Sequence, residues 1–388
     1  MGPAAGGAPL LAASESALAT VLGVVQAPTQ VDRHGWQAQL RVERVIGGAL
    51  AETRPRIAWE ELAPGRPLRF RDGGRVLVAL EPLPGGTLWL KRFPDRQGYA
   101  VGARGTAFLR DPDAASVDGL AAWLAVPAAE RGAAADIEAL SGLAAHADPD
   151  LSGAALQRLD TVPGLDGRLT PAARDTLAGL LADAARPREL RVALLQMIGL
   201  RRLASLHDAV AALDAPESPL RPQAIDALAG IEGGLPRERV EALLASADPD
   251  LRAAGARHAR DARFTAELRR LLREDPAPQV RAAAVGPLIV SRRAADMDAV
   301  TPALFDSDPI VREAAVLGLG SLGEAAVPTL ERLAMLHTPP EVAAPLVSLT
   351  LAGPAGAKAL DRIAANHPDP KARALARTFL GREAFPRH

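Results

Sequence analysis

The chain has 388 residues, of which 48% are hydrophobic and 23% are charged, so it has ample apolar material for a buried core. Its 45 basic and 46 acidic residues leave a net charge of −1, which gives no overall attraction for nucleic acid or an anionic membrane. The absence of cysteine excludes disulfides, thiolate metal sites and a cysteine nucleophile. No apolar run reaches the roughly 18 residues that would span a bilayer, and we expect no intact signal peptide.

The first part of the chain is expected to form a tail and a small β domain. Residues 1–14 are small, uncharged and rich in glycine and proline, which predicts a flexible tail. Over residues 15–113, strand-like patterns at Trp36–Val45, Arg75–Leu80 and Thr87–Lys91 alternate with glycine-rich turns. About five or six short strands in this length predict a small antiparallel β-barrel or sandwich.

Aromatic residues are few and unevenly placed. They make up 3% of the chain, and eight of the twelve lie before residue 124. A small barrel needs large side chains to fill its interior, so we expect Trp36, Trp59 and Trp89 to pack in the core. The alternative is that these rings form exposed platforms for a sugar or a peptide.

Residues 116–388 are rich in alanine, leucine and arginine and contain an internal repeat. Its signature is Asp-Pro, one residue, an apolar residue and arginine, as in Asp248–Arg252 and Asp308–Arg312. The arginine position recurs at intervals of 29–31 residues, at Arg191, Arg221, Arg252, Arg281, Arg312, Ala343 and Arg373. Ser152 begins the series 39 residues before Arg191, and the loop Thr161–Leu169 accounts for the excess. The period predicts about eight stacked helix pairs.

Each repeat has the pattern of two helices joined by a tight turn. The first helix carries a buried stripe, as at Phe264, Leu268 and Leu272. Aspartate in the turn can accept hydrogen bonds from the free amides of the second helix, and proline fits its first turn without losing one.

These units resemble HEAT repeats, specifically the short bacterial kind first noted in phycobilisome lyases. The resemblance rests on the Asp248/Arg252 and Asp308/Arg312 pairs and implies an all-α solenoid after the β domain. In such repeats aspartate and arginine of successive units pair in a ladder. By that resemblance a structural role falls to Asp248, Arg252, Arg281, Asp308, Arg312, Arg191, Arg221 and Arg373. Alanine at position 343 and serine at position 152 should interrupt the ladder near its ends.

The β domain resembles the OB-type barrel of tissue-inhibitor and netrin-like modules. The similar segments are Ala19–Val25, Leu40–Gly48 and Gly74–Leu80. Those modules carry cysteines, which this chain lacks, so their inhibitory function is not carried over.

No familiar catalytic motif is present. Gly318–Gly323 matches G-x-G-x-x-G, but the dinucleotide fingerprint must follow a strand, and this one closes a predicted helix. The seven histidines show no zincin-type spacing, and the common hydrolase and nucleotide-hydrolase signatures are absent. We therefore expect no enzyme activity, no cofactor and no metal.

Charge clusters in the middle of the repeat region. Residues 208–250 carry nine acidic and three basic residues, whereas residues 252–293 carry ten arginines and four acids. A possible partner or anion patch consists of Arg257, Arg260, Arg263, Arg269, Arg270 and Arg273. The alternative is an ordinary solvated surface.

One face of the second helices can be sampled from the repeat. The slots that should point away from the core include Glu313, Leu317 and Ser321, then Ala282, Gly286 and Val290 in the preceding unit, and Ala253, Arg257 and Asp261 in the unit before that. Neither an aromatic track nor a basic groove emerges, which argues against nucleic acid as a ligand and favours a protein partner.

The leading hypothesis is a non-enzymatic protein-interaction scaffold or adaptor. The alternative is a lyase- or isomerase-like enzyme that holds a cofactor or pigment in the solenoid concavity, and a third is a DNA-binding solenoid that uses the arginine patch. Three lysines against 42 arginines suit a GC-rich bacterial genome. We expect a periplasmic or secreted protein whose leader is absent, with the cytoplasm as the alternative.

Overall fold

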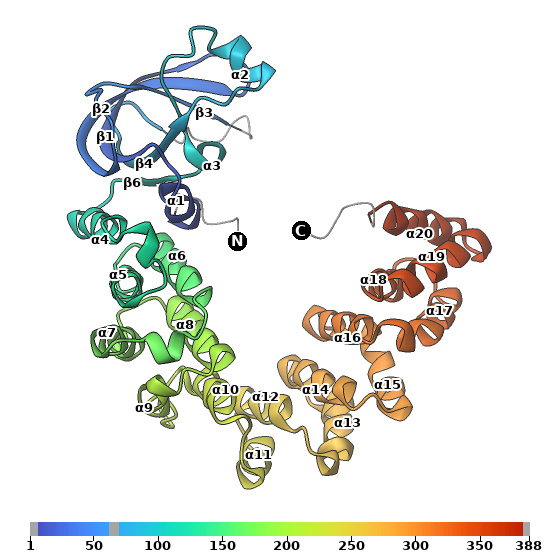
Figure 1. The fold of residues 1–388 in the computed structure, drawn as a ribbon. Helices are drawn as coiled ribbons and strands as arrows, with labels where there is room; N and C mark the ends of the chain where they lie inside the picture. The colour runs from blue at the N-terminus through green and yellow to red at the C-terminus, as the bar shows by residue number, and fades with distance from the viewer. Residues whose placement is uncertain (1–6, 62–69, 383–388) are drawn as a thin grey trace. The chain divides into compact units, whose positions relative to one another are not determined.

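The computed structural model describes residues 7–61 and 70–382 (Figure 1). The chain divides into two compact units, unit 1 with residues 1–231 and unit 2 with residues 232–388. Within the described ranges, unit 1 holds all the strands and the earlier helices, and unit 2 is built from helices alone.

The strands of unit 1 form a closed barrel, as the sequence predicts. They are β1 (Ala19–Gln30), β2 (Gly35–Gly48), β3 (Arg56–Glu60), β4 (Arg75–Pro82), β5 (Tyr99–Val101) and β6 (Phe108–Arg110). Around the sheet the order is β1-β2-β3-β5-β4, and β4 pairs again with β1, so five strands close while β6 adds to β4. The pair β3–β5 is parallel, which corrects the expectation of a wholly antiparallel sheet. β5 is antiparallel to β4, and β4 runs opposite to β3, so β5 and β3 run in the same direction.

Aromatic rings fill the barrel interior. Trp59 and Phe70 are buried, with ring centroids 4.7 Å apart, and Phe70 lies 4.8 Å from Phe108. Trp36 is half-buried and stacks on Trp59 across the β2–β3 pair. Trp36 and Trp59 therefore serve packing, as expected for so small a barrel.

The predicted strand at Thr87–Lys91 is wrong, because this segment forms helix α2 (Thr87–Arg92). The helical period stacks Trp89 on Phe93, with centroids 5.6 Å apart. It also brings the buried Arg92 guanidinium to two carboxylates, donating from Nε to Asp32 Oδ2 and from Nη1 to Glu60 Oε1, each at 2.5 Å. The hydrogen bond from Arg92 lowers the pKa of Asp32 to about 2. Tertiary contacts thus select a helix where alternation suggested a strand.

The predicted flexible tail at 1–14 is corrected for residues 7–14, which form helix α1 (Gly7–Ser14). Leu10 and Leu11 are buried in the core that α1 shares with β4, β6 and the later helix α6 (Pro149–Asp160). Burial of two leucines offsets the entropy of ordering a segment of small residues. Residues 1–6 lie outside the described part of the chain.

The remaining helices of unit 1 all follow strand β5, the first of them before β6 and the others after it. They are α3 (Gly102–Gly105), α4 (Ala114–Leu124), α5 (Ala134–Ala144), α6, α7 (Pro171–Ala182), α8 (Arg188–Arg201), α9 (His207–Ala211) and α10 (Arg221–Glu232), with 3₁₀ turns η1 (Ala128–Glu130), η2 (Leu165–Arg168) and η3 (Ala204–Leu206). One core runs from Leu22 and Leu77 of the barrel to Leu228 on α10. Strands therefore give way to helices between Arg110 and Ala114, whereas the compact units divide near residue 231.

A buried carboxylate holds the start of the helical region. Asp136 on α5 accepts from Trp123 Nε1 and Arg131 Nη1, each at 2.9 Å, and from the amide of Gly132 at 2.7 Å. The guanidinium of Arg131 lies over the ring of Trp123, 4.2 Å from its centroid. This network fixes the turn between α4 and α5.

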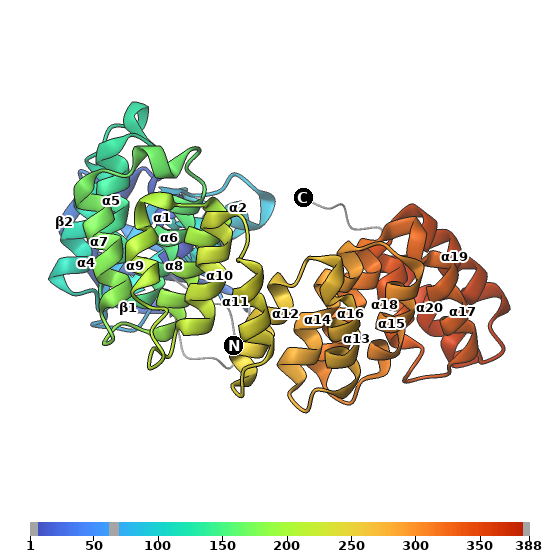
Figure 2. The same cartoon turned by 90° about the horizontal axis from the view of Figure 1, so that it is seen from below.

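Unit 2 is a series of helix pairs (Figures 1 and 2). Its helices are α11 (Arg237–Leu244), α12 (Pro249–His258), α13 (Thr265–Glu274), α14 (Pro278–Val290), α15 (Ala294–Val300), α16 (Pro309–Ser321), α17 (Val327–Leu336), α18 (Ala343–Leu351), α19 (Pro354–Asn366) and α20 (Pro370–Arg382), with 3₁₀ turns η4 (Ala262–Phe264), η5 (Thr301–Phe305) and η6 (Gly323–Ala326). The second helices of successive pairs, α12, α14, α16 and α18, pack on one another and form the second-helix face. The expected stripe at Phe264, Leu268 and Leu272 is buried.

The G-x-G-x-x-G match lies at the end of α16, as expected. Gly323 follows the helix with φ of +60°, a conformation suited to glycine. The match therefore marks a helix end inside a repeat, where no strand precedes it.

Candidate binding surfaces

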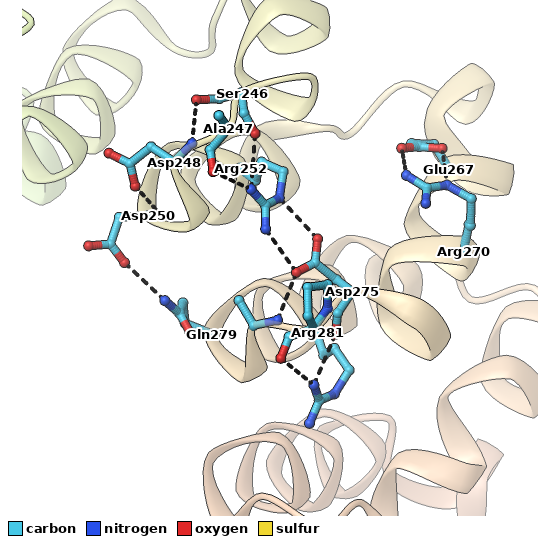
Figure 3. A network of polar contacts seen from close by, with 12 residues as sticks. Ser246, Ala247, Asp248, Asp250, Arg252, Glu267, Arg270, Asp275, Gln279 and Arg281 are labelled. Carbon is cyan, nitrogen blue, oxygen red and sulfur yellow. Dashed lines mark hydrogen bonds and ion pairs between the residues drawn. The ribbon is translucent and has the colours of Figure 1, made fainter.

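The arginine ladder of unit 2 is built from the side chain at each repeat's arginine position (Figure 3). Arg252 donates from Nε and Nη2 to the two carboxylate oxygens of Asp275 in the next repeat, at 3.0 and 3.1 Å. Its Nη1 donates to the carbonyl oxygens of Ser246 and Ala247 in its own turn. One guanidinium thus closes its own turn and joins it to the next repeat.

The same geometry recurs one repeat later. Arg281 donates to both carboxylate oxygens of Asp306, at 2.9 and 2.8 Å, and to the carbonyls of Asp275 and Pro276. Arg312 donates to the carbonyls of Asp306 and Ser307.

The acidic partners of the ladder differ from those that the resemblance implied. Asp248 and Asp308 cap their own helices, accepting from the amides of Asp250 and Ile310. They stand four residues before the arginine, at the N-cap, where the carboxylate turns back onto the free amides. The true partners, Asp275 and Asp306, stand six residues before an arginine position, at the end of a first helix.

The ladder carboxylates are held ionised by their partners. Burial opposes ionisation of Asp275, but hydrogen bonds from Arg252 and from the amide of Ala277 outweigh it and lower the pKa. For Asp306 the hydrogen bond from Arg281 is the largest influence, and the pKa is again lowered.

The ladder changes near the end of unit 2, where position 343 is alanine. His367, buried at the end of α19, lies 2.9 Å through Nε2 from the carbonyl oxygen of Ala334 and 3.1 Å from that of His337. The amide of Asp369 donates to its Nδ1, so Nδ1 is the acceptor and Nε2 carries the proton. In the last repeat Arg373 donates to the carbonyl of His367 in its own turn.

In unit 1 the arginine positions make local contacts. Arg191 is buried and donates from Nε to the carbonyl oxygen of Leu181 at 2.8 Å. Arg221 donates to Asp214 at 3.2 Å. At the first position, the hydroxyl of Ser152 donates to the carbonyl oxygens of His146 and Asp148.

The six arginines of the predicted patch lie on α12, η4, α13 and the connection after α12. Four of them are ion-paired within unit 2: Arg263 with Asp261, Arg269 with Asp296, Arg270 with Glu267 and Arg273 with Glu274. Arg257 is half-buried on α12, and Arg260 is exposed after it. These local pairs use much of the positive charge, and a binding role for the six stays a prediction.

A small pocket in unit 2 lies beside Arg260. Its volume is about 190 Å³, and Arg293, Ser291 and Val290 also line it. It lies where the loops after α12 and α14 meet. Counting charged residues along the sequence could not locate this place.

The second-helix face exposes apolar side chains. Val290 on α14 is 71% exposed, and Leu317 on α16 is 53% exposed. These are two of the slots predicted to point away from the core. Ala253, which the same rule placed outward on α12, is instead buried in the core of unit 2 because that small side chain packs inward.

A larger cleft lies at one end of the barrel, and sequence reasoning missed it. Its volume is about 790 Å³, and its lining includes Arg54, Arg56, Arg96 and Tyr99. The hydroxyl of Tyr99 donates to Glu52 at 3.0 Å, and burial together with this contact raises the Tyr99 pKa. Its arginines come from two distant stretches of the chain, residues 54–56 and 96, so no local pattern marks the cleft.

Neither a metal site nor a membrane-spanning helix occurs among the residues that the structure describes. Among residues 7–61 and 70–382, no three His, Asp or Glu side chains converge so as to hold a metal ion. None of the helices in these ranges combines the length and the apolar character needed to cross a bilayer.

Comparisons with known proteins concern the helical region. Residues 265–349 match the family of HEAT repeats. No curated protein sequence matches the chain. Among solved structures, human deoxyhypusine hydroxylase in complex with glycerol is 20% identical, with a TM-score of 0.32 over 64% of this chain and 96% of that chain. The Escherichia coli protein YibA is 16% identical, with a TM-score of 0.35 over 66% and 98%. The chain thus combines an N-terminal β-barrel with a HEAT-like helical solenoid, and residues 265–349 are the part that matches the HEAT family.

Proposed function

We propose that the protein is a protein-interaction scaffold that binds a partner through the second-helix face of unit 2. The observation that carries the proposal is the exposure of Val290 and Leu317, two large apolar side chains on neighbouring helices. HEAT repeats commonly mediate protein interaction, and the matched segment 265–349 contains both residues.

The two side chains come from places where α14 and α16 meet closely. A Cβ atom at Gly318, next to Leu317, would lie 3.1 Å from Cγ1 of Ile289, the neighbour of Val290. Val290 and Leu317 therefore flank the contact line between the two helices. Apolar side chains held on rigid helices lose little entropy when a partner covers them.

The surroundings of this pair are mixed in character. Arg293 and Ser291 follow Val290 in the chain, and Glu313 is exposed on α16. An apolar centre with polar groups around it is the usual anatomy of a protein interface. This composition supports a protein partner.

The test is affinity capture from the source organism followed by mass spectrometry of bound proteins, with Leu317→Glu and Val290→Glu as variants. Burying a new carboxylate at an interface anchor should weaken binding by about 2 kcal/mol or more, roughly 30-fold in Kd. Leu336→Glu is the matched control, because Leu336 is 69% exposed but lies on the first helix α17.

We expect the control to keep the partner and the two variants to lose it, with unchanged far-UV circular dichroism in all three. Retention of the same partner by the double variant would refute the assignment of the face. Turnover of a small molecule by protein that captures no partner would refute the scaffold function itself.

A further inference from the structure

The barrel-end cleft is a built feature with a definite place in the fold. It lies at the end of the barrel where β1, β3 and β5 begin and β4 ends, since Leu18, Arg56, Tyr99 and Pro82 all line it. The mouth of a β-barrel is a common place for a ligand site. This site is independent of the second-helix face, because all its residues belong to unit 1.

One arginine fixes the cleft wall. Arg56 donates from Nε to the carbonyl oxygen of Gln97 at 2.9 Å and from Nη2 to Asp95 at 2.5 Å, and its guanidinium lies 5.3 Å from the centroid of Phe93. The hydrogen bond from Arg56 lowers the pKa of Asp95, so this pair stays ionised near neutral pH. Arg56 therefore holds the loop before β5 in place, and its hydrogen-bond donors are used there.

The same loop contains two residues in the left-handed region. Gly98 has φ of +101°, and a Cβ atom there would lie 2.5 Å from the carbonyl oxygen of Arg56, so only glycine fits. Arg96 has φ of +53°, which is strained for a residue with a side chain. Strained backbone of this kind concentrates at functional sites.

Two other arginines in the cleft are available to a ligand. Arg54 and Arg96 are exposed, and their guanidinium groups make no hydrogen bond or ion pair with any part of the chain that the structure describes. Glu52 is the one carboxylate in the lining and already accepts from Tyr99. Because Asp95 neutralises Arg56, the remaining charges are those of Arg54 and Arg96 against Glu52, which leaves the cleft electropositive.

We propose that the barrel-end cleft binds an acidic peptide segment, with Arg54 and Arg96 as the groups that receive its carboxylates. A guanidinium presents paired N–H donors that match a carboxylate. The amides of Gln39 and Gln97, also in the lining, offer donors and acceptors for peptide groups.

The size and walls of the cleft favour a peptide over a small anion. A volume of about 790 Å³ lies within the range of organic ligand sites and far exceeds a single phosphate. Leu18, Pro82 and Leu83 add apolar surface on one side, which an inorganic ion would leave uncovered. An extended peptide with acidic and apolar side chains would contact both the arginines and the apolar surface of the cleft.

The chain offers a selective probe, because Tyr99 is its only tyrosine. Full-length protein labelled with ring-fluorinated tyrosine should give one fluorine NMR signal from the cleft. We expect a hexaglutamate peptide to shift this signal in a saturable way that weakens as salt is added. Hexalysine should leave it unmoved.

Two variants and one control test the named residues. Arg54→Ala and Arg96→Gly should each weaken hexaglutamate binding about tenfold. Glycine also relieves the strain at φ of +53°, so Arg96→Gly should fold at least as stably as the parent chain. Arg33→Ala is the control, since Arg33 is exposed in the β1–β2 turn at the opposite end of the barrel, and it should bind as the parent does.

Three outcomes would overturn the proposal. These are a fluorine signal that hexaglutamate does not move, binding that survives in the double variant Arg54→Ala/Arg96→Gly, and an equal shift from inorganic phosphate at the same concentration. The last would make the cleft a simple anion site.

Discussion

Replacing Asp275 by asparagine tests the ladder at its best-defined rung. The side chain keeps its shape but loses its charge, and its amide group must face the guanidinium of Arg252, which made two hydrogen bonds to the carboxylate. The side chains of Asp275 and Arg252 are 5% and 15% exposed, so water replaces little of what is lost.

The size of the expected loss in unfolding free energy depends on the hydrogen bonds that Arg252 keeps. Stranding one partner of a fully buried ion pair costs about 3–5 kcal/mol. Arg252 still donates to two carbonyl oxygens in its own turn, so its charge keeps part of its solvation. A charge-assisted hydrogen bond contributes about 1.5–3 kcal/mol, and we therefore expect Asp275→Asn to lower the free energy of unfolding by about 2–3 kcal/mol.

The matched control is Glu267→Gln, which breaks an exposed ion pair with Arg270 on α13. Exposed pairs contribute little, so the expected loss is at most about 0.5 kcal/mol. Urea unfolding followed by far-UV circular dichroism measures both variants, and hydrogen exchange over residues 246–281 shows whether the loss is local. A loss below about 0.5 kcal/mol for Asp275→Asn, or one equal to the control, would refute the structural account of the ladder.

Four further outcomes are expected. The lowered pKa of Asp306 means that its stabilisation is fully present above the ordinary value of 3.8 and is lost as pH falls through the folded value. Asp306→Asn should therefore flatten the acid-side fall in unfolding free energy, as measured by urea titrations at several pH values. A Cβ at Gly356 would clash with the carbonyl oxygen of Leu349, so Gly356→Ala should lower the free energy of unfolding by about 2 kcal/mol or more. Gly179, on α7 with open space around it, should instead gain up to about 1 kcal/mol when changed to alanine. Asp136→Asn should cost about 2–4 kcal/mol and alter tryptophan fluorescence, since its carboxylate accepts from a buried indole; an unchanged spectrum would contradict this.

The repeat could be predicted because each helix pair buries the same stripe. Leu268 and Leu272 recur at a helical spacing that has one physical explanation, and the arginine position sets the period. The partner of that arginine could not be predicted in the same way. Asp306 and Asp308 both stand before Arg312, and only the helix boundary, which a sequence fixes poorly, separates a ladder partner from a cap.

The barrel contains further features that could not be predicted from the sequence. Residues 7–14 and 87–92 become helices through contacts with distant parts of unit 1, which no local pattern carries. The cleft is harder still to predict from the sequence. Arg54 and Arg96 are 42 positions apart, and they come together only when the barrel closes. A charge count along the chain finds clusters of neighbours, and it therefore pointed to residues 252–293 instead.

The substitution of the ladder near residue 343 shows what the arginine position does. Ala343 has no donor to offer, yet the carbonyl oxygen of His337 is met by the imidazole of His367 from the following repeat. The imidazole takes over part of the task that a guanidinium performs at Arg252 and Arg281, the contact with the carbonyl oxygens of the turn. The carbonyl oxygens of the repeat turn need a hydrogen-bond donor, and different side chains can supply it. Arginines at this position follow from the architecture, so evidence of ligand binding has to come from arginines that the fold leaves unengaged, such as Arg54 and Arg96 in the barrel-end cleft.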